Sequence, residues 1–192
     1  NIDLHLKDKN NDRPLEIAVK NSKNSALKLL LDVEDLNSIY DLKDVKCLDA
    51  LRLIHDTTGF NLLMIASKFN NQEVLDFFLK FKILDVNFKG NEQKTALDVA
   101  MSVKNHEVIL KLLLNNAKYS EDLKKYVDRS LIEENSEILK KISLFCEDMK
   151  KIHDLVTKID ELSEKAPSSD QHTQEFLSIL FKYPNLTHFY NS

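Results

Sequence analysis

The sequence predicts an all-α fold, a short helical-repeat solenoid with a C-terminal helical extension, and three observations support this prediction. The 192 residues include only 2 glycines and 3 prolines, whereas average usage would give about 13 glycines. Few turns are therefore expected to need a positive φ, and most of the chain can be helical. The other two observations are a recurring leucine–alanine pattern before residue 118 and a heptad spacing of apolar residues after it.

The composition is that of a folded domain. Hydrophobic residues make up 43% of the chain, charged residues 30%, and the formal net charge is −4; such a chain is too apolar to be disordered. Almost all basic residues are lysine, and the arginines are Arg13, Arg52 and Arg129. Because arginine usually makes the contacts to phosphate, this composition and the negative net charge argue against a nucleic-acid partner.

No segment predicts secretion or a membrane partner. No apolar run approaches the roughly 20 residues of a membrane span. The N-terminus, Asn1 to His5, lacks the basic-then-apolar order of a signal peptide, and we expect the chain to be an excised piece of a larger protein. Cys47 and Cys146 have no second cysteine nearby, so we expect reduced, packed thiols. These features predict an intracellular protein, cytoplasmic or nuclear.

Three segments share a leucine that is followed three residues later by an alanine: Leu15 and Ala18, Leu63 and Ala66, Leu97 and Ala100. Each segment precedes a polar stretch and then a second apolar block, at 26–31, 74–79 and 109–114. The pattern predicts two short antiparallel helices per unit, because the alanine lets the first helix approach its neighbour and the leucines give the second a wide apolar face. The polar stretches 21–24 and 68–71 are expected to be the turns between the helices.

The pattern resembles the ankyrin repeat, whose first-helix motif is Thr-Pro-Leu-His-x-Ala. The units that carry the resemblance lie at about 10–37, 59–87 and 88–117, and further matches are Pro14, Gly59, Thr95 and Asp85-Val86-Asn87. The motif histidine is replaced by Glu16, Met64 and Asp98, and the turn glycine by Ser22, Asn70 and Asn105. In the third finger loop, Gly90 replaces the usual aspartate and Gln93 stands in place of the glycine.

The spacing of the motif leucines is uneven. Leu15 and Leu63 are 48 residues apart, whereas Leu63 and Leu97 are 34 apart. The surplus falls near 38–58, where residues 43–54 have helical periodicity. This segment is either a degenerate repeat, since Leu48 lies 33 residues after Leu15, or a helix inserted in a finger loop. We therefore expect ankyrin-like repeats over 1–117 with an irregular helical insertion near 38–58.

Residues 118–192 are expected to form a helical extension. Ser120 can cap a helix that runs to about Glu133. The apolar residues that follow have the alternating spacing of four and three typical of a/d heptad positions: Ile138, Ile142, Phe145, Met149, Ile152, Val156 and Ile159. This spacing predicts one long helix. A break at 166–170 follows the long helix. After the break we expect a return helix that ends before Pro184 and carries Phe176, Leu177, Leu180 and Phe181.

Two interpretations of this extension stay open. In the first, the long helix and the return helix cap the last repeat, because the end of a solenoid needs cover for its apolar core. In the second, the heptad residues at 138–159 form a seam for self-association, a homodimer through the C-terminal helices, or for pairing with a partner helix.

No constellation of residues predicts catalysis. The histidines never occur in a metal-binding spacing such as H-E-x-x-H, and no phosphate loop, nucleophile elbow or paired Cys–His grouping occurs. We therefore expect a non-enzymatic protein with no catalytic residue, no cofactor and no metal.

The ankyrin resemblance implies a protein-interaction module, an adaptor or scaffold, that binds another protein or peptide through a concave groove and the finger tips. The groove candidates in this chain are Lys68, Phe69, Met101 and Val103, and the finger candidates are Phe60, Phe88 and Lys89. Phe69 and Val103 are apolar where the end of a first helix should otherwise be polar, and an aromatic side chain in a groove is a common interface anchor. The other interpretation of Phe69 is that it packs under its neighbouring turn. The alternative is a helical assembly module that uses the seam at 138–159.

Overall fold

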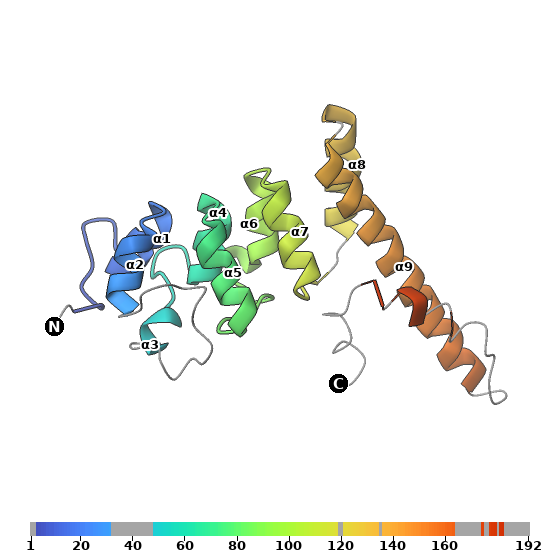
Figure 1. Ribbon diagram of the computed structural model, residues 1–192, viewed down its shortest axis with the longest axis horizontal. Helices are drawn as coiled ribbons and strands as arrows, with labels where there is room; N and C mark the ends of the chain where they lie inside the picture. The colour runs from blue at the N-terminus through green and yellow to red at the C-terminus, as the bar shows by residue number, and fades with distance from the viewer. Residues whose placement is uncertain are drawn as a thin grey trace. The chain divides into compact units, whose positions relative to one another are not determined.

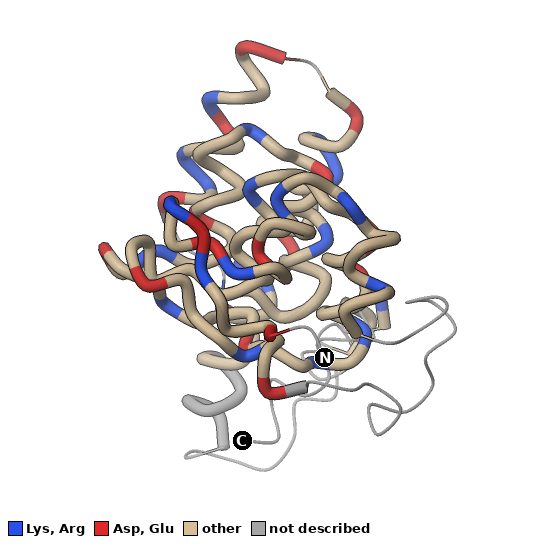
Figure 2. The backbone as a smooth tube through the Cα atoms, turned by 90° about the vertical axis from the view of Figure 1, so that its left-hand side faces the viewer, with Lys and Arg blue, Asp and Glu red and all other residues tan. Residues whose placement is uncertain are grey.

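The computed structural model describes residues 3–31, 48–118, 121–134, 136–163, 174, 177–179 and 181–182, without the side chains of 48, 121 and 158–163. The chain divides into two compact units, residues 1–112 and 113–192. Both units are built from helices, and no strand occurs in the described ranges, so the all-α prediction is confirmed. Basic and acidic positions are interspersed along each unit (Figure 2).

Three helical hairpins follow one another along residues 14–114 (Figure 1). The first pairs α1 (Pro14–Lys20) with α2 (Asn24–Leu31), the second pairs α4 (Leu62–Phe69) with α5 (Gln72–Phe81), and the third pairs α6 (Ala96–Ser102) with α7 (His106–Leu114). The first helices of the hairpins are stacked, because α4 packs against both α1 and α6. These helices and the turns between them lie where the leucine–alanine pattern predicts them.

Side-chain caps determine where these short helices begin. Asn61 precedes α4, and its Oδ1 accepts a hydrogen bond of 2.9 Å from the Met64 backbone N–H. Thr95 and Asp98 form a capping box at the start of α6, in which each side chain accepts a hydrogen bond from the backbone N–H of the other. Losing such a cap typically costs about 1 kcal/mol, so these polar residues fix the helix starts.

The motif leucines and alanines supply the core of the first unit. Each of Leu15, Ala18, Leu63, Ala66, Leu97 and Ala100 is at most 4% exposed. One buried polar side chain adds a specific tie between the first two hairpins: Asn71 is 2% exposed, and its Nδ2 donates to the Val19 carbonyl (3.2 Å) and to Asn24 Oδ1 (2.9 Å). Because a buried amide needs partners, Asn71 favours this one stacking arrangement.

Left-handed backbone recurs at fixed positions of the repeat. The residue four positions before each motif leucine has a positive φ: Asn11 (66°), Gly59 (66°) and Gln93 (59°). The residue seven positions after it does too: Ser22 (50°), Asn70 (56°) and Lys104 (54°). The expectation that few turns need a positive φ was therefore wrong. The chain has few glycines because asparagine, lysine, serine and glutamine occupy these positions instead.

The third turn also corrects the predicted glycine equivalents. The left-handed residue there is Lys104, and not Asn105. Asn105 instead caps α7, since its Oδ1 accepts a hydrogen bond of 3.3 Å from the Val108 N–H. The resemblance had aligned this turn one residue too late.

Substitution of Lys82 tests how much a left-handed backbone conformation lowers the free energy of unfolding when the residue has a Cβ. It ends α5 with φ 49° and ψ 37°, a conformation that disfavours a side chain with a Cβ. We expect Lys82→Gly to raise the free energy of unfolding by about 0.5–1 kcal/mol. The control Lys80→Gly, inside the same helix, should lower it by about 1 kcal/mol. Urea unfolding followed by circular dichroism measures both, and equal losses would contradict the prediction.

Only one short helix, α3 (Leu48–Leu51), occurs in the described part of the segment 38–58. Helical periodicity predicted a helix that continues to residue 54, but the chain leaves the helix after Leu51. Ala50 and Leu51 are buried, so α3 contributes to the core of the first unit. Residues 38–47 lie outside the described ranges.

Two helices dominate the second unit. α8 (Glu121–Glu133) and α9 (Glu137–Ser163) pack against each other, and both were expected, although Ser120 itself lies outside the described residues. Ile152 and Leu155 of α9 form a buried cluster with Ile179, so the described part of the expected return helix, 177–179, reaches α9. Phe176, Leu180 and Pro184 are not described. The boundary near residue 117 and the capping of the last repeat stay predictions.

Cys146 in α9 is a buried free thiol. Burial, with the nearby carboxylates of Asp128 and Glu147, raises the pKa of this thiol from 9.0 to about 11. Because only the thiolate is reactive, we expect Cys146 at pH 8 to react with iodoacetamide about 100-fold more slowly in the native protein than in urea. Peptide mapping by mass spectrometry measures the two rates. Equal rates would contradict the burial of Cys146. The other cysteine, Cys47, lies outside the described residues.

Candidate functional site

A short loop, here called a finger, precedes the first helix of each hairpin. In finger 1 (residues 8–12), the Asp8 N–H donates to the Asp12 carbonyl (2.9 Å). Finger 2 (55–60) is closed in the same way from His55 to Phe60 (2.8 Å), and finger 3 (90–94) from Gly90 to Lys94 (2.9 Å). A second backbone bond, donated by the left-handed residue of each loop, tightens the turn. The three fingers are therefore closed by corresponding backbone hydrogen bonds, although finger 2 is one residue longer than the other two.

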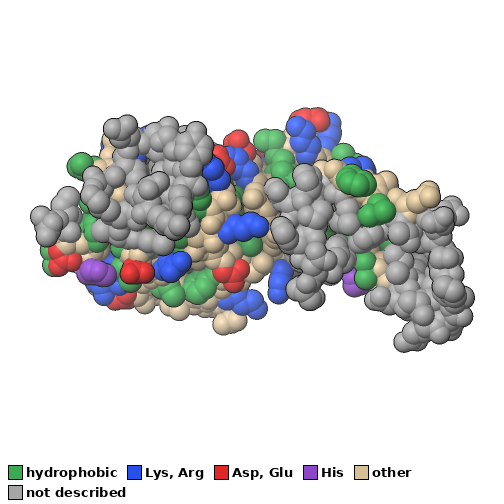
Figure 3. Space-filling model, turned by 60° about the horizontal axis from the view of Figure 1, so that its bottom comes forward, with side chains coloured by type: hydrophobic (Ala, Val, Ile, Leu, Met, Phe, Trp, Pro, Cys, Tyr) green, Lys and Arg blue, Asp and Glu red, His purple; other side chains and the backbone are tan. Residues whose placement is uncertain are grey.

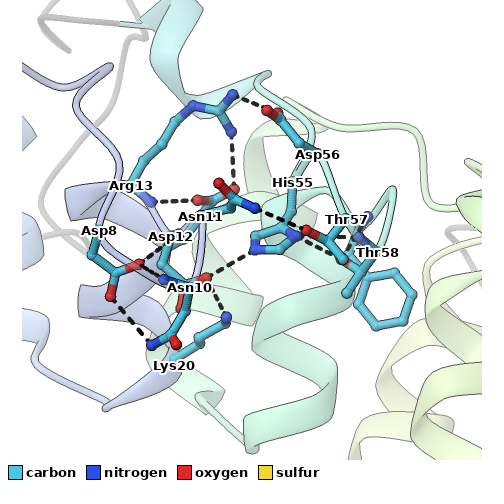
Figure 4. Close-up of polar contacts among 12 residues, drawn as sticks. Asp8, Asn10, Asn11, Asp12, Arg13, Lys20, His55, Asp56, Thr57 and Thr58 are labelled. Carbon is cyan, nitrogen blue, oxygen red and sulfur yellow. Dashed lines mark hydrogen bonds and ion pairs between the residues drawn. The ribbon is translucent and has the colours of Figure 1, made fainter.

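A polar network that is buried at Arg13 and Glu16 and exposed at Asp56 joins fingers 1 and 2 (Figure 4). The Arg13 guanidinium donates to the Ile54 carbonyl (3.1 Å) and to Asp56 Oδ1 (2.9 Å), and it lies 3.3 Å from Glu16 Oε1. The side chains of Arg13 and Glu16 are 11% and 3% exposed. The pKa of Asp56 lies below its usual value. The main cause is the hydrogen bond from the Lys7 ammonium, and the second is the hydrogen bond from the Arg13 guanidinium. Arg13 thus connects three carbonyl or carboxylate groups from two parts of the chain.

His55 extends this network. Its Nδ1 accepts a hydrogen bond of 3.2 Å from the Thr58 backbone N–H, so in the neutral ring the proton lies on Nε2. Nε2 is 3.0 Å from Asp12 Oδ1, an electrostatic contact that lacks the alignment of a hydrogen bond. The ring therefore turns a protonated nitrogen toward the carboxylate of the first finger.

Asp12, Glu16 and His55 are the residues of this network that could approach one metal ion, since their ligand atoms lie within 4.8 Å of one another. The arrangement is better explained without a metal. Asp12 already pairs with Lys20, and both oxygens of Glu16 accept hydrogen bonds from Arg13. A divalent cation would have to displace these two positive charges and the Nε2 proton of His55. The chemistry of the cluster is that of a structural tie between fingers.

Fingers 2 and 3 approach each other at the only two glycines of the chain. A Cβ on Gly90 would lie 2.8 Å from the Gly59 carbonyl oxygen, and a Cβ on Gly59 would lie 2.6 Å from the Asn91 backbone nitrogen. The Asn91 Nδ2 also donates to the Thr57 carbonyl (3.1 Å). No side chain fits between these backbones, so the contact depends on glycine.

The groove and finger candidates differ in how exposed their side chains are. Phe69 at the end of α4 and Val103 just after α6 are each 41% exposed, and Lys68 and Lys89 are exposed as well. The Lys68 Nζ lies 5.7 Å from the centre of the Phe69 ring. The half-buried candidates are Phe60, Phe88 and Met101. Phe69 and Val103 both lie six residues after a motif leucine, at equivalent places in the stacked hairpins α4–α5 and α6–α7.

The heptad residues lie mostly in the interior of the second unit. Ile142, Phe145 and Ile152 are at most 2% exposed, and Ile138, Met149 and Val156 are half-buried. The side chain of Ile159 is outside the described set. Leu139, Cys146 and Leu155 are buried beside them, so the apolar face of α9 is wider than a two-residue heptad seam.

A cavity in the second unit that is lined by described residues is smaller than a typical ligand pocket. A cavity of about 110 Å³ lies between α8 and α9, lined by residues that include Lys124, Ser143 and Lys150, whereas ligand pockets usually measure about 300–1,000 Å³. On the face drawn in Figure 3, hydrophobic side chains and charged side chains of both signs lie next to one another. Among the described residues, no helix is long and apolar enough to cross a membrane.

Residues 39–123 match the family model of ankyrin repeats (3 copies). This part of the chain is therefore similar to ankyrin repeats. The hairpin α1–α2 lies before the matched range, yet it shares the buried leucine and alanine and the left-handed turn of the ankyrin repeats α4–α5 and α6–α7. Ankyrin repeats generally bind other proteins, and the family is typically non-enzymatic. Among proteins with curated descriptions, none matches this sequence.

Sequence reasoning alone does not predict the network between fingers 1 and 2. Arg13 and Asp56 are 43 residues apart, and so are Asp12 and His55. Their pairing depends on how two fingers separated by an irregular segment stack. The one usable signal was the charge at finger positions, since Asp8 and Asp56 both stand seven residues before a motif leucine. The Asp8 carboxylate accepts bonds from the backbone N–H groups of Asp12 and Asn10, which lower its pKa.

Proposed function

We propose that this chain is a non-enzymatic adaptor or scaffold module that binds a partner protein through the groove and fingers of its ankyrin repeats. The observation that carries the proposal is the exposure of Phe69 and Val103, at equivalent places of neighbouring repeats. Every other apolar residue of α4 is buried, from Leu62 to Ala66. Phe69 is therefore exposed by its position, and not because the helix is loosely packed.

The physical basis is the usual composition of protein interfaces. Aromatic side chains are enriched among the residues that carry most of the binding free energy, while surrounding polar residues exclude water. In the sequence, Lys68 is next to Phe69, and Ser102 and Lys104 flank Val103; all three polar residues are exposed. An intracellular location, cytoplasmic or nuclear, goes with this proposal and is supported by the free thiol of Cys146.

The test is affinity capture from cell extract with the wild-type chain and with Phe69→Glu/Val103→Glu, read by mass spectrometry. The matched control is Ile132→Glu/Leu144→Glu, which also changes two exposed apolar residues, 87% and 58% exposed, but in α8 and α9. Thermal melts establish first that all variants are folded. We expect to capture a partner with the wild type and with the control variant, but not with Phe69→Glu/Val103→Glu. A partner set that survives this change, or is lost only in the control, would contradict the proposal.

The alternative is a helical assembly module that self-associates or pairs with a partner helix through the seam at 138–159. It has weaker support, because Ile142, Phe145 and Ile152 are already buried within one chain. For a homodimer through this seam, light scattering should show a dimeric wild type that Ile152→Asp converts to monomer. A wild type that is monomeric at tens of micromolar would rule it out.

A further inference from the structure

One side of the first hairpin is apolar and open to solvent. This side, here called the open end, is formed by Ile17 of α1 and by Ala26, Leu29 and Leu30 of α2. Ile17 is 37% exposed and Leu29 is 73% exposed, while Ala26 is exposed and Leu30 is half-buried. The end units of a repeat array usually have a polar outer face that keeps the array soluble. The first hairpin has apolar side chains there instead.

The residues at the same positions of the second and third hairpins are buried. Positions are compared by counting from the motif leucine of each hairpin. The corresponding residues, each at most 3% exposed, are Ile65, Val74, Phe77 and Phe78 in the second hairpin and Val99, Val108 and Leu112 in the third. The remaining position, that of Leu29, is Lys111 in the third hairpin. A surface that is covered in two hairpins is therefore exposed in the first.

These positions face the preceding hairpin of the stack. If they faced the following one, α4 and α5 would cover Ile17 and Leu29, which are exposed. Lys111 shows the same direction, because its Nζ lies 2.7 Å from Oδ1 of Asp76 in the preceding hairpin. The open end is therefore the kind of surface onto which a preceding hairpin stacks.

The opposite side of a hairpin indicates what the open end accepts. Met64 of α4 lies on that side, since a Cβ on Gly90 in finger 3 would be 3.1 Å from its Cε. A second copy of this chain stacked head to tail would offer its third hairpin, where Asp98 takes the place of Met64. The Asp98 carboxylate caps α6 through the Thr95 N–H (2.8 Å), and burying it against apolar side chains costs free energy. A hairpin of another protein, with an apolar residue at this position, is the better match.

We propose that the open end docks the last helical hairpin of another ankyrin-type protein. The contact continues the packing of α4 against α1 and α6 by one more hairpin. Ile17 and Leu29 become buried in it, as the corresponding residues of the second and third hairpins already are. Because Phe69 and Val103 belong to those other two hairpins, a partner at the open end and a partner in the proposed groove bind independently.

The probe is a designed array of identical ankyrin repeats that keeps its N-terminal cap and lacks its C-terminal cap, so that its last hairpin is uncovered. Isothermal titration calorimetry should show that the full chain binds this array and does not bind the same array with both caps. Ile17→Glu/Leu29→Glu should weaken binding at least about tenfold, because two apolar contacts are replaced by charges. The matched control Ile132→Glu/Leu144→Glu changes two exposed apolar residues of the second unit and should bind like the wild type.

Urea unfolding establishes first that the variants are folded, and Leu29→Glu alone replaces the double variant if that one is not. A wild type that does not bind the uncapped array, or binds both arrays equally, would overturn the proposal, and so would an unchanged affinity of the open-end variant. Light scattering tests the competing occupant: a dimeric wild type that Leu29→Glu converts to monomer would identify a second copy instead. Phe69→Glu/Val103→Glu should bind the uncapped array like the wild type, which keeps this test separate from that of the groove.

Discussion

Replacing Gly59 by alanine is expected to lower the free energy of unfolding by about 3 kcal/mol or more. Two effects add at this position. Its φ of 66° lies in the left-handed region, which costs a residue with a Cβ about 1–2 kcal/mol. The new Cβ would also lie 2.6 Å from the backbone nitrogen of Asn91, which cannot rotate away. Fingers 2 and 3 would therefore have to separate.

Two further variants divide these effects and can be measured by urea unfolding. Gly90→Ala introduces the close approach alone, because Gly90 has an ordinary φ of −77°, so its loss should be smaller than that of Gly59→Ala. Ser22→Ala changes an exposed left-handed residue that already has a Cβ, and should shift stability by less than about 0.5 kcal/mol. If Gly59→Ala were as mild as Ser22→Ala, the two fingers would not be in contact as described.

Arg13→Met is expected to lower the free energy of unfolding by about 3 kcal/mol. The reason is the charge left behind: the Glu16 side chain is 3% exposed, and without the guanidinium its carboxylate would lack a counter-ion. The informative comparison is Arg13→Met/Glu16→Leu. Replacing a buried pair by apolar residues is often close to neutral, whereas removing one partner is not. The double variant should therefore be more stable than Arg13→Met alone, and the opposite order would contradict the role given to Glu16.

Asp56 provides a second measurement on the same variant. Lys7 and Arg13 lower its pKa, so Asp56 contributes stability that is fully present above its unfolded pKa and is lost as the pH falls through the lower folded pKa. Arg13→Met should raise the pKa of Asp56 toward the ordinary value. A carboxyl titration by NMR follows this group directly. An unchanged pKa would mean that Arg13 does not reach Asp56 in solution.

The helices of the repeats could be predicted from the sequence because the information is local. A leucine followed by an alanine three residues later places one face of a short helix, and Asn61 or Thr95 supplies its start. The same local logic failed at the turns, since left-handed positions are usually recognised by glycine and this chain uses Ser22, Asn70 and Lys104. The third turn was misaligned for this reason.

The candidate surface was predictable in part. Phe69 and Val103 were singled out because an apolar residue at the end of a first helix breaks the expected polar pattern, and both are exposed. The tie between fingers 1 and 2 was not predictable, because no sequence rule relates Arg13 to Asp56 across an irregular spacing. The period of the heptad residues was evident from the sequence, but packing within the chain and an intermolecular seam both stayed open. In the structure, Ile142 and Phe145 are buried within a single chain.

The uneven spacing of the repeats has a consequence for how the array tolerates change. Packing α1 on α4 closes a loop between motif leucines 48 residues apart, against 34 for α4 and α6. Because loop-closure entropy grows only with the logarithm of length, the longer loop costs about 0.3 kcal/mol more. That amount is smaller than one helix cap. The connection between the first two hairpins can therefore lengthen or shorten during evolution with almost no thermodynamic penalty, provided that the polar tie from Arg13 to finger 2 is kept.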